Sequence, residues 1–275
     1  MAEMTKESDK VTLKDEGFMD WSALTSVSIG RAQALVIAGI AVVVILGLEF
    51  AVWYLEIPPY VFPAPSAIAR ALVLNFPTIF PHLVVTLTEL AIGYTIGATI
   101  GILLAGVVTQ FPFVEKVITP YILIMVMTPA VALVPLLILR FGFGLTPRII
   151  AISLAVGPMV MINASTGFRR TDNAKIALAR SYGATTMQIF RKVRFPLALP
   201  MIIVGLMVGA IFGLVTAIGA EMVGGGMGLG TRLQYYSSLA RMAPFFAVIV
   251  IIATIGILIY VFFYFVGKKW ASWEA

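Results

Sequence analysis

Long apolar runs separated by short polar segments set the pattern of this chain. A helix that crosses the hydrocarbon core of a bilayer needs about 20 predominantly apolar residues. Six stretches meet that requirement, approximately at Ala32–Leu55, Val84–Val108, Val117–Leu139, Pro147–Gly167, Leu197–Gly219 and Pro244–Val266. The pattern therefore predicts an all-α, polytopic membrane protein with six transmembrane helices.

Prolines and glycines predict where these spans depart from regular helices. Pro120, Pro129 and Pro135 fall within the third span, where we expect kinks or a break. Proline is tolerated in a span when neighbouring helices satisfy the backbone groups that it frees. The fourth span contains Gly157 and Pro158, which also indicate irregular backbone packed inside protein.

Two further patterns concern helix packing and the first loop. Gly205, Gly209 and Gly213 recur at every fourth position of the fifth span, and small residues at this spacing let helices approach closely. The prolines that follow the first span end that helix. Ser66 is then predicted to cap a short helix, from about Ala67 to Leu74, that lies at the membrane interface.

The composition supports a membrane protein and excludes several kinds of chemistry. Hydrophobic residues make up 60% of the chain and charged residues 12%, with a mean hydropathy of +1.02, whereas soluble domains carry about 25% charged residues. The chain has no cysteine, and its single histidine, His82, cannot form a histidine metal cluster, so we expect no metal or cofactor on this chain. The net charge of +6 does not indicate nucleic acid, because in a membrane protein the location of the charge matters more than its sum.

Lysine and arginine positions predict the orientation of the spans. With the N-terminus inside, the inner segments hold Lys6, Lys10, Lys14, Arg31, Lys116, Arg169, Arg170, Lys175, Arg180, Arg191, Lys192, Arg194, Lys268 and Lys269, and the outer segments hold Arg70, Arg140, Arg148, Arg232 and Arg241. This bias favours both termini in the cytoplasm. We expect residues 1–31 to form a cytoplasmic tail, residues 32–267 a six-span domain with a cytoplasmic loop at 168–196, and residues 268–275 a second cytoplasmic tail.

The basic loop carries local signals for two short helices. Asp172 can cap a helix that runs to Tyr182, because its carboxylate accepts hydrogen bonds from free backbone amides. Gly183 fits the left-handed position that ends such a helix, and Thr185 or Thr186 can cap the next one. The sequence thus predicts a bent helix–glycine–helix unit that lies on lipid headgroups or docks into a partner. A connecting loop that merely carries the positive-inside charge is the alternative.

The second of these helices is predicted to be amphipathic. Met187, Phe190 and Val193 recur every third residue and form an apolar stripe, while Arg191 falls on the other side. Pro196 stands at the entry to the fifth span, where a helix can start but cannot continue from the residues before it.

The loop resembles the cytoplasmic signature of ABC importer permeases, which reads Glu-Ala-Ala, three residues, Gly, nine residues, Ile, one residue, Leu-Pro. Gly183 takes the place of the glycine, Val193 that of the isoleucine, and Phe195-Pro196 that of the final pair. Ala179 holds the third position of the opening triplet, but Ala177 replaces its Glu. A role of that Glu therefore does not carry over to this chain.

Other segments extend the resemblance to the nitrate, sulfonate and taurine branch, which also includes permeases for thiamine-pyrimidine precursors. The segment Pro129–Ile149 resembles the third span and outer turn of these proteins. Gly219–Leu233, with the sequence GAEMVGGGMGLGTRL, resembles a late segment of the same branch, and the segment VFPAPSAI resembles its entry to the interfacial helix. The resemblance covers about residues 32–267.

This resemblance implies the type I ABC importer permease fold in a bacterial plasma (inner) membrane. It implies two copies of the permease, or this chain and a relative, two cytoplasmic ATPases that hold ATP and Mg²⁺, and a periplasmic or lipoprotein solute-binding protein. The chain itself has no G-x-x-x-x-G-K-[ST] loop with which to cradle nucleotide phosphates, so we expect it not to be an enzyme. The residues expected at the ATPase contact are Ala179, Arg180, Tyr182, Gly183, Ala184, Phe190, Arg191 and Pro196.

Three polar residues within the spans are candidates for the translocation path. Glu89 either lines the path or pairs with a nearby base such as Arg140 or Arg148. Glu221 either contacts the solute or caps and pairs locally, and Asn163 either lines the path or makes a hydrogen bond between helices. Glu49 is expected to reach the interface with its carboxylate.

The function that these features favour is the permease subunit of an ATP-driven importer. The acidic Glu89 and the form of the loop favour a small organic solute, such as a pyrimidine or vitamin precursor, and nitrate, sulfonate or taurine is the alternative. An ion-gradient-driven secondary transporter is an alternative of another class, but no paired intramembrane charges or broken inverted repeats support it. The glycine-rich segment 224–230 follows no strand, so we expect a flexible outer turn or gate rather than a phosphate loop.

Overall fold

The computed structural model describes residues 31–270, and every regular element in that range is helical. The predicted N-terminal tail lies outside the described residues except for Arg31, and so do residues 271–275. The chain divides into two units, one that ends at Gly47 and one that begins at Leu48. Most of α2 (Arg31–Tyr54), which matches the first predicted span, belongs to the first unit.

The second unit contains the other helices. They are α3 (Pro65–Gln110), α4 (Pro112–Met127), the 3-10 helix η1 (Ala130–Leu133), α5 (Val134–Phe141), α6 (Leu145–Arg169), α7 (Asn173–Ser181), α8 (Thr186–Ile189), the π-helix η2 (Phe190–Arg194), α9 (Phe195–Gly224), α10 (Leu229–Ser238) and α11 (Met242–Trp270). Within the described range five helices are long and apolar enough to cross a membrane, and the bent pair formed by α4 and η1–α5 makes a sixth candidate. The six predicted spans are thus confirmed, and α10 is an additional short helix.

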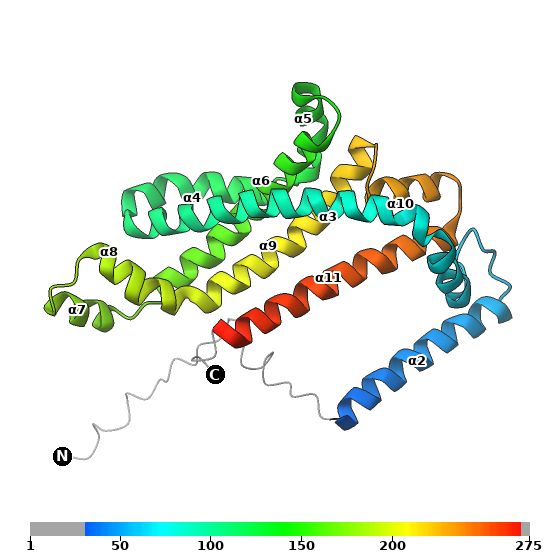
Figure 1. The fold of residues 1–275 in the computed structure, drawn as a ribbon, viewed down its shortest axis with the longest axis horizontal. Coiled ribbons are helices and arrows are strands. Elements are labelled where there is room, and N and C mark those ends of the chain that lie inside the picture. The colour runs from blue at the N-terminus through cyan, green and yellow to red at the C-terminus, as the bar shows by residue number, and fades with distance from the viewer. Residues whose placement is uncertain (1–30, 271–275) are drawn as a thin grey trace, which may run out of the picture. The chain divides into compact units, whose positions relative to one another are not determined.

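Helices α3, α6 and α9 lie side by side at the centre of this unit (Figure 1). Glycines bring α3 onto α6: a Cβ atom added at Gly97 would stand 2.7 Å from the Ser153 carbonyl oxygen, and one added at Gly101 would stand 2.5 Å from that of Gly157. No side chain fits where the backbones come this close. The two helices therefore pack through their main chains.

The glycine spacing in the fifth span has the predicted effect on α9. A Cβ atom at Gly205 would stand 2.8 Å from the Cβ of Asn163, and one at Gly209 would stand 2.8 Å from Cγ2 of Val160, both on α6. Val160 is fully buried in the core between these helices. Helix α6 is thus held between two glycine-lined neighbours, and the corresponding glycines of α3 were not singled out from the sequence.

The third span is broken where its prolines predict a break. Helix α4 ends at Met127, Thr128 and Pro129 are extended, and η1 with α5 continues at an angle of 86° to α4. Pro135 lies in the first turn of α5, where its missing N–H has no partner in any case. Gly142, with a φ of 78°, ends α5.

The predicted interfacial helix is not a separate element, and its cap is different. Helix α3 runs for 46 residues from Pro65 through Pro77 and Pro81, because a proline removes one intrahelical hydrogen bond without always ending the helix. Ser66 does not cap it: its N–H and hydroxyl instead donate to the Glu49 carboxylate at 2.9 and 2.6 Å. The Glu49 carboxylate therefore binds the first turn of α3.

Candidate functional site

The coupling segment, which we define as residues 172–196, has the local structure that its sequence predicts. The Asp172 carboxylate accepts from the Ala174 N–H at 2.8 Å and caps α7. Gly183 has a φ of 76°, the left-handed conformation that ends a helix. Thr185 caps α8 in a capping box with Gln188, whose side chain accepts from the Thr185 N–H at 2.8 Å. Each helix end is therefore specified by residues within the segment.

The apolar side chains of the coupling segment divide into two groups. Leu178 and Met187 are exposed at 59% and 64%, and Tyr182 is exposed at 83%. Ile176 and Ile189 are buried at 7% and 5%. One group thus anchors the segment to the rest of the chain, and the side chains of the other group are exposed on its surface.

The expected ATPase-contact residues differ in exposure. Arg180, Tyr182, Gly183 and Arg191 are exposed, whereas Ala179, Ala184, Phe190 and Pro196 are half-buried. Phe190 faces inward: its ring lies 5.2 Å from that of Phe168, and its Cζ would meet a Cβ at Gly106 at 3.3 Å. Its position in the structure is therefore that of a brace between the coupling segment and α3 and α6.

Pro196 lies in the first turn of α9, where a helix start was expected, but the residues before it are helical as well, which corrects the expectation that the helix cannot continue from them. The helix runs without a break from Thr186 to Gly224, 39 residues, and includes the π-helical turn η2. In that turn the Phe195 N–H donates to the Phe190 carbonyl. The wider π turn precedes Pro196, and it accommodates a residue that lacks an N–H and whose ring would crowd a regular α-turn. The coupling segment is consequently continuous with α9.

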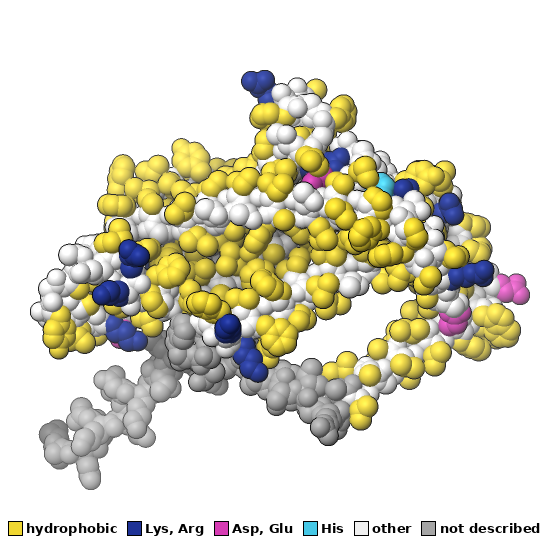
Figure 2. All heavy atoms as spheres, viewed as in Figure 1, with side chains coloured by type: hydrophobic (Ala, Val, Ile, Leu, Met, Phe, Trp, Pro, Cys, Tyr) yellow, Lys and Arg dark blue, Asp and Glu magenta, His cyan; other side chains and the backbone are white. Residues whose placement is uncertain are grey.

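Basic side chains surround the coupling segment. Figure 2 shows Lys and Arg side chains gathered at the α7–α8 end of the second unit. Arg169, at the end of α6, forms an ion pair of 2.6 Å with Glu115 of α4, but both side chains are partly exposed. Exposed pairs of this kind contribute only about 0–1 kcal/mol to stability. The packing of Ile176, Ile189 and Phe190 therefore fixes the segment more than the ion pair does.

At the other end of α9, the path candidate Glu89 is paired with Arg148. The Arg148 Nη1 atom lies 2.6 Å from Glu89 Oε1, and the two side chains are 5% and 0% exposed. Arg148 Nη1 also donates to the Met227 carbonyl at 2.8 Å, and Nη2 donates to the Gly225 carbonyl. Pairing, one of the two alternatives for Glu89, is the arrangement that the structure contains.

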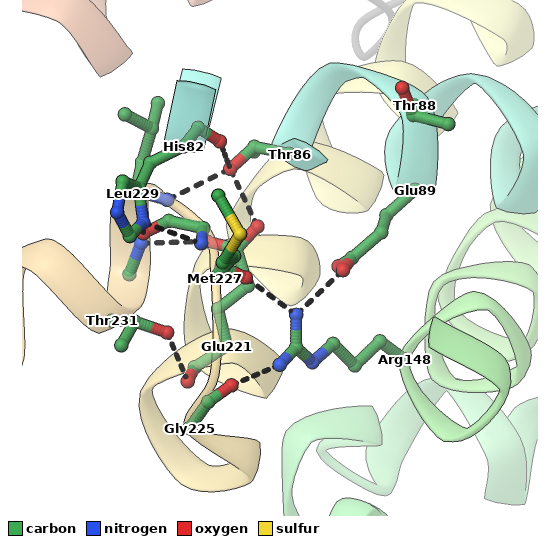
Figure 3. Close-up of polar contacts among 12 residues, drawn as sticks. His82, Thr86, Thr88, Glu89, Arg148, Glu221, Gly225, Met227, Leu229 and Thr231 are labelled. Carbon is green, nitrogen blue, oxygen red and sulfur yellow. Dashed lines mark hydrogen bonds and ion pairs between the residues drawn. The ribbon is translucent and has the colours of Figure 1, made fainter. Parts of the chain in front are cut away.

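Glu221 lies in the same cluster and is also fully buried (Figure 3). Its carboxylate accepts from the Thr86 hydroxyl and from the Gly230 N–H, each at 2.6 Å. Thr86 Oγ1 in turn accepts from the Leu229 N–H at 2.9 Å, and His82 Nδ1 accepts from the Gly228 N–H at 2.9 Å. Sequence reasoning missed the roles of Thr86 and His82, because these partners are 135 to 146 positions away.

The remaining path candidate, Asn163, is half-buried on α6. Its Nδ2 donates to the Met159 carbonyl of the same helix at 2.8 Å rather than to a neighbouring helix. Glu89, Asn163 and Glu221 are thus not gathered at one surface. Among residues 31–270 no group of three His, Cys, Asp or Glu side chains is placed to hold a metal ion.

Comparison with known proteins identifies the class. Residues 97–272 match the family described as the binding-protein-dependent transport system inner membrane component, and this match covers more than half of the chain. The chain therefore belongs to that family. It is a multi-pass plasma-membrane protein and the permease subunit of an ABC importer.

Individual relatives agree with this class. A probable ABC transporter permease of Haemophilus influenzae is 28% identical over 78% of this chain and 90% of its own length. The taurine transport system permease protein TauC of Escherichia coli is 28% identical over 84% of this chain and 86% of its own. The formylaminopyrimidine transport permease protein ThiX of Halalkalibacterium halodurans is 29% identical over 73% of this chain and 80% of its own.

Solved structures confirm the predicted fold. A chain of an amino acid ABC transporter is 22% identical in sequence and has a TM-score of 0.57. The match covers 74% of this chain and 95% of the transporter chain. A chain of the inward-facing MetNI methionine ABC transporter is 21% identical in sequence and has a TM-score of 0.58. The match covers 70% of this chain and 93% of the transporter chain. At these identities the likeness concerns the fold alone.

Proposed function

We propose that this permease is driven by cytoplasmic ATPases that dock on the coupling segment, and that it moves a small organic solute handed over by a solute-binding protein. The observation that carries the docking is the exposed apolar group of Leu178, Tyr182 and Met187. Three large apolar side chains exposed within ten residues of a polar segment favour a protein interaction surface. Arg180 and Arg191 beside them supply charges that set the register of a partner.

The buried residues of the coupling segment connect the proposed docking surface to the membrane-spanning helices. Ile176 and Ile189 are buried, and Phe190 packs on Phe168. A force applied at Tyr182 or Met187 therefore reaches α6 and α9 through packed side chains rather than through a free loop. In this proposal Phe190 transmits the motion, and Tyr182 makes the contact.

The assembly that follows from this proposal contains other subunits. Two ATPase subunits would hold ATP and Mg²⁺, since this chain contributes no nucleotide-binding loop. A second permease copy would complete the pathway, as a homodimer or with a related chain in a heterodimer. Cytoplasmic termini remain the predicted orientation, and membrane lipid would surround the spans.

For the substrate we favour a small organic solute such as a pyrimidine or vitamin precursor. The formylaminopyrimidine relative and the riboflavin permease RibX of Chloroflexus aurantiacus, 27% identical over 79% of this chain, support this choice. The taurine and sulfonate relatives support the alternative. Glu89 no longer contributes to the choice, because its carboxylate is buried against Arg148 and presents no free charge to a solute.

The docking is tested with Tyr182→Asp, and Tyr182→Phe is the matched control. Because Tyr182 is 83% exposed, neither substitution disturbs the folded chain. Aromatic hot spots contribute about 2 kcal/mol or more to binding, so Tyr182→Asp should weaken ATPase binding about 30-fold or more. Tyr182→Phe keeps the apolar ring and should bind normally. Equal ATPase binding by the wild type and Tyr182→Asp would refute the assigned contact.

The energy source and the solute need separate measurements. In proteoliposomes, transport should require the ATPase, ATP and the loaded binding protein together. Transport by this chain alone, driven by an ion gradient, would instead support a secondary transporter. Mass spectrometry of the small molecule that co-purifies with the partner binding protein identifies the solute, and taurine or an alkyl sulfonate there would favour the alternative substrate class.

A further inference from the structure

The segment 225–230, which comprises the turn between α9 and α10 and the first two residues of α10, is held at almost every position. Side chains bind the carbonyls of Gly225 and Met227 and the N–H groups of residues 228, 229 and 230. The side chains that do so are His82 and Thr86 of α3, Arg148 of α6 and Glu221 of α9 (Figure 3). We call this set of contacts the loop clasp. The predicted flexible turn is therefore a fixed element that joins three helices.

Steric fit confirms that the loop is closely packed. Gly228 has a φ of 145°, and a Cβ atom at that position would overlap the Glu221 carboxylate. A Cβ atom at Gly230 would overlap the Ile218 carbonyl oxygen. Only glycine allows the backbone to approach these groups closely enough for the Gly230 N–H to reach Glu221. Gly228 and Gly230 thus serve close contact in this structure.

The loop clasp and the coupling segment occupy the two ends of one continuous helix. The helix from Thr186 to Gly224 has 39 residues and includes the π turn η2 and Pro200, so its length measured along the axis is about 58 Å at 1.5 Å per residue. Between its ends it packs on α6 through Gly205 and Gly209. A displacement of the coupling segment is therefore carried along this helix to the clasp, because packed helices move as rigid elements.

We propose that the loop clasp locks the middle of α3, the first turn of α6 and the last turn of α9 into one rigid unit, and that Thr86 and Arg148 are positioning residues that convert motion of the coupling segment into solute transport. The proposal rests on the ATPase-driven function proposed above. With the clasp broken, the far end of α9 slips relative to α3 and α6, and ATP is hydrolysed without the matching transport.

Thr86→Val breaks the clasp with the smallest change. Valine has nearly the shape of threonine but cannot donate to Glu221 or accept from the Leu229 N–H. The matched control is Thr88→Val on the same helix: the Thr88 side chain is exposed, points away from the cluster, and its hydroxyl donates only to the Val84 carbonyl (Figure 3).

The main measurement is the amount of solute transported per ATP hydrolysed in proteoliposomes with ATPase and loaded binding protein. Thr86→Val should lower this ratio about tenfold, within the range typical of coupling between sites, and Thr88→Val should leave it unchanged. A nitroxide on Met227→Cys, a unique thiol because the chain has no cysteine, should gain mobility only in Thr86→Val. A mobile label with an unchanged ratio would overturn the proposal.

A second experiment, cross-linking of α10 to α3, does not depend on how well Thr86→Val folds. Arg232 Nη2 of α10 lies 3.5 Å from the Thr78 carbonyl of α3, beside the clasp. In the double variant Thr78→Cys/Arg232→Cys, a short bifunctional thiol reagent should join α10 to α3 without loss of transport, since the proposal requires no movement between them. Loss of transport on cross-linking, recovered on cleavage of the linker, would show that the clasp must open and would overturn the proposal.

The two proposals fail in distinguishable ways. If the wild-type complex shows no ATP-driven transport with the loaded binding protein, the proposed function is wrong. If the wild type transports normally and Thr86→Val keeps the same ratio of solute to ATP, only the role of the clasp is wrong.

Discussion

The glycine seam between α3 and α6 gives a prediction whose magnitude follows from the structure. In Gly101→Ala the new Cβ would stand 2.5 Å from the Gly157 carbonyl oxygen, 3.0 Å from the Val160 Cβ and 3.2 Å from the Met161 N. All three atoms belong to the backbone or to the stiff base of a side chain, so no side-chain rotation relieves the overlap. The two helices must move apart, and such overpacking costs about 1–3 kcal/mol.

A control at Gly256 isolates that cost. In Gly256→Ala the nearest atom to the new Cβ is Leu214 Cδ2, at 3.9 Å, which is ordinary van der Waals contact. Both substitutions lie inside helices and both gain up to about 1 kcal/mol of helix propensity. The propensity gain therefore cancels when the two variants are compared, and Gly101→Ala should be less stable than Gly256→Ala by about 1–3 kcal/mol.

The assay is the free energy of unfolding in mixed micelles, obtained by titration with a denaturing detergent. Helix content reports on the transition, and the wild type is measured alongside. If Gly101→Ala proves as stable as Gly256→Ala, α3 and α6 are not in main-chain contact at this level, and the central packing described above is wrong.

Two further predictions use the same unfolding measurement. Arg148→Gln leaves the buried Glu89 carboxylate without its partner and should lower the free energy of unfolding by about 3–5 kcal/mol. The double variant Glu89→Gln/Arg148→Gln should recover most of that loss. Equal losses in the two variants would show that the charges do not interact. Phe190→Ala removes a half-buried ring from Phe168 and should cost about 2 kcal/mol, below the 3–5 kcal/mol of a fully buried Phe. It should also speed tryptic cleavage after Arg191, and unchanged cleavage would contradict the bracing role.

The sequence by itself determined the spans, both ends of α7 and the start of α8. A span needs a run of apolar residues of known length, so hydropathy locates it without knowledge of its neighbours. Asp172, Gly183 and Thr185 act on backbone groups only a few residues away, so their roles can also be predicted from the local sequence. The break at Pro129 is also predictable from the local sequence, since it follows from the geometry of proline.

The expectations that failed were those in which packing outweighs local preference. Ser66 has the chemistry of a cap, but the Glu49 carboxylate, 17 positions away, takes both of its donors. Pro196 has the chemistry of a helix start, but the π turn before it keeps the helix continuous. A residue type allows more than one local role. The groups that the rest of the fold brings near the residue decide which role it takes.

Only the tertiary structure decided what the buried charges and the glycine-rich loop do. The cluster of Glu89, Arg148 and Glu221 joins three helices. Hydrogen bonds in and beside it connect residues that are far apart in the sequence: Thr86 and Glu221 are separated by 135 positions, and His82 and Gly228 by 146. No periodicity or motif records such a contact, because it depends on how the helices pack. A buried charge must find a partner, and packing alone decides which partner is within reach.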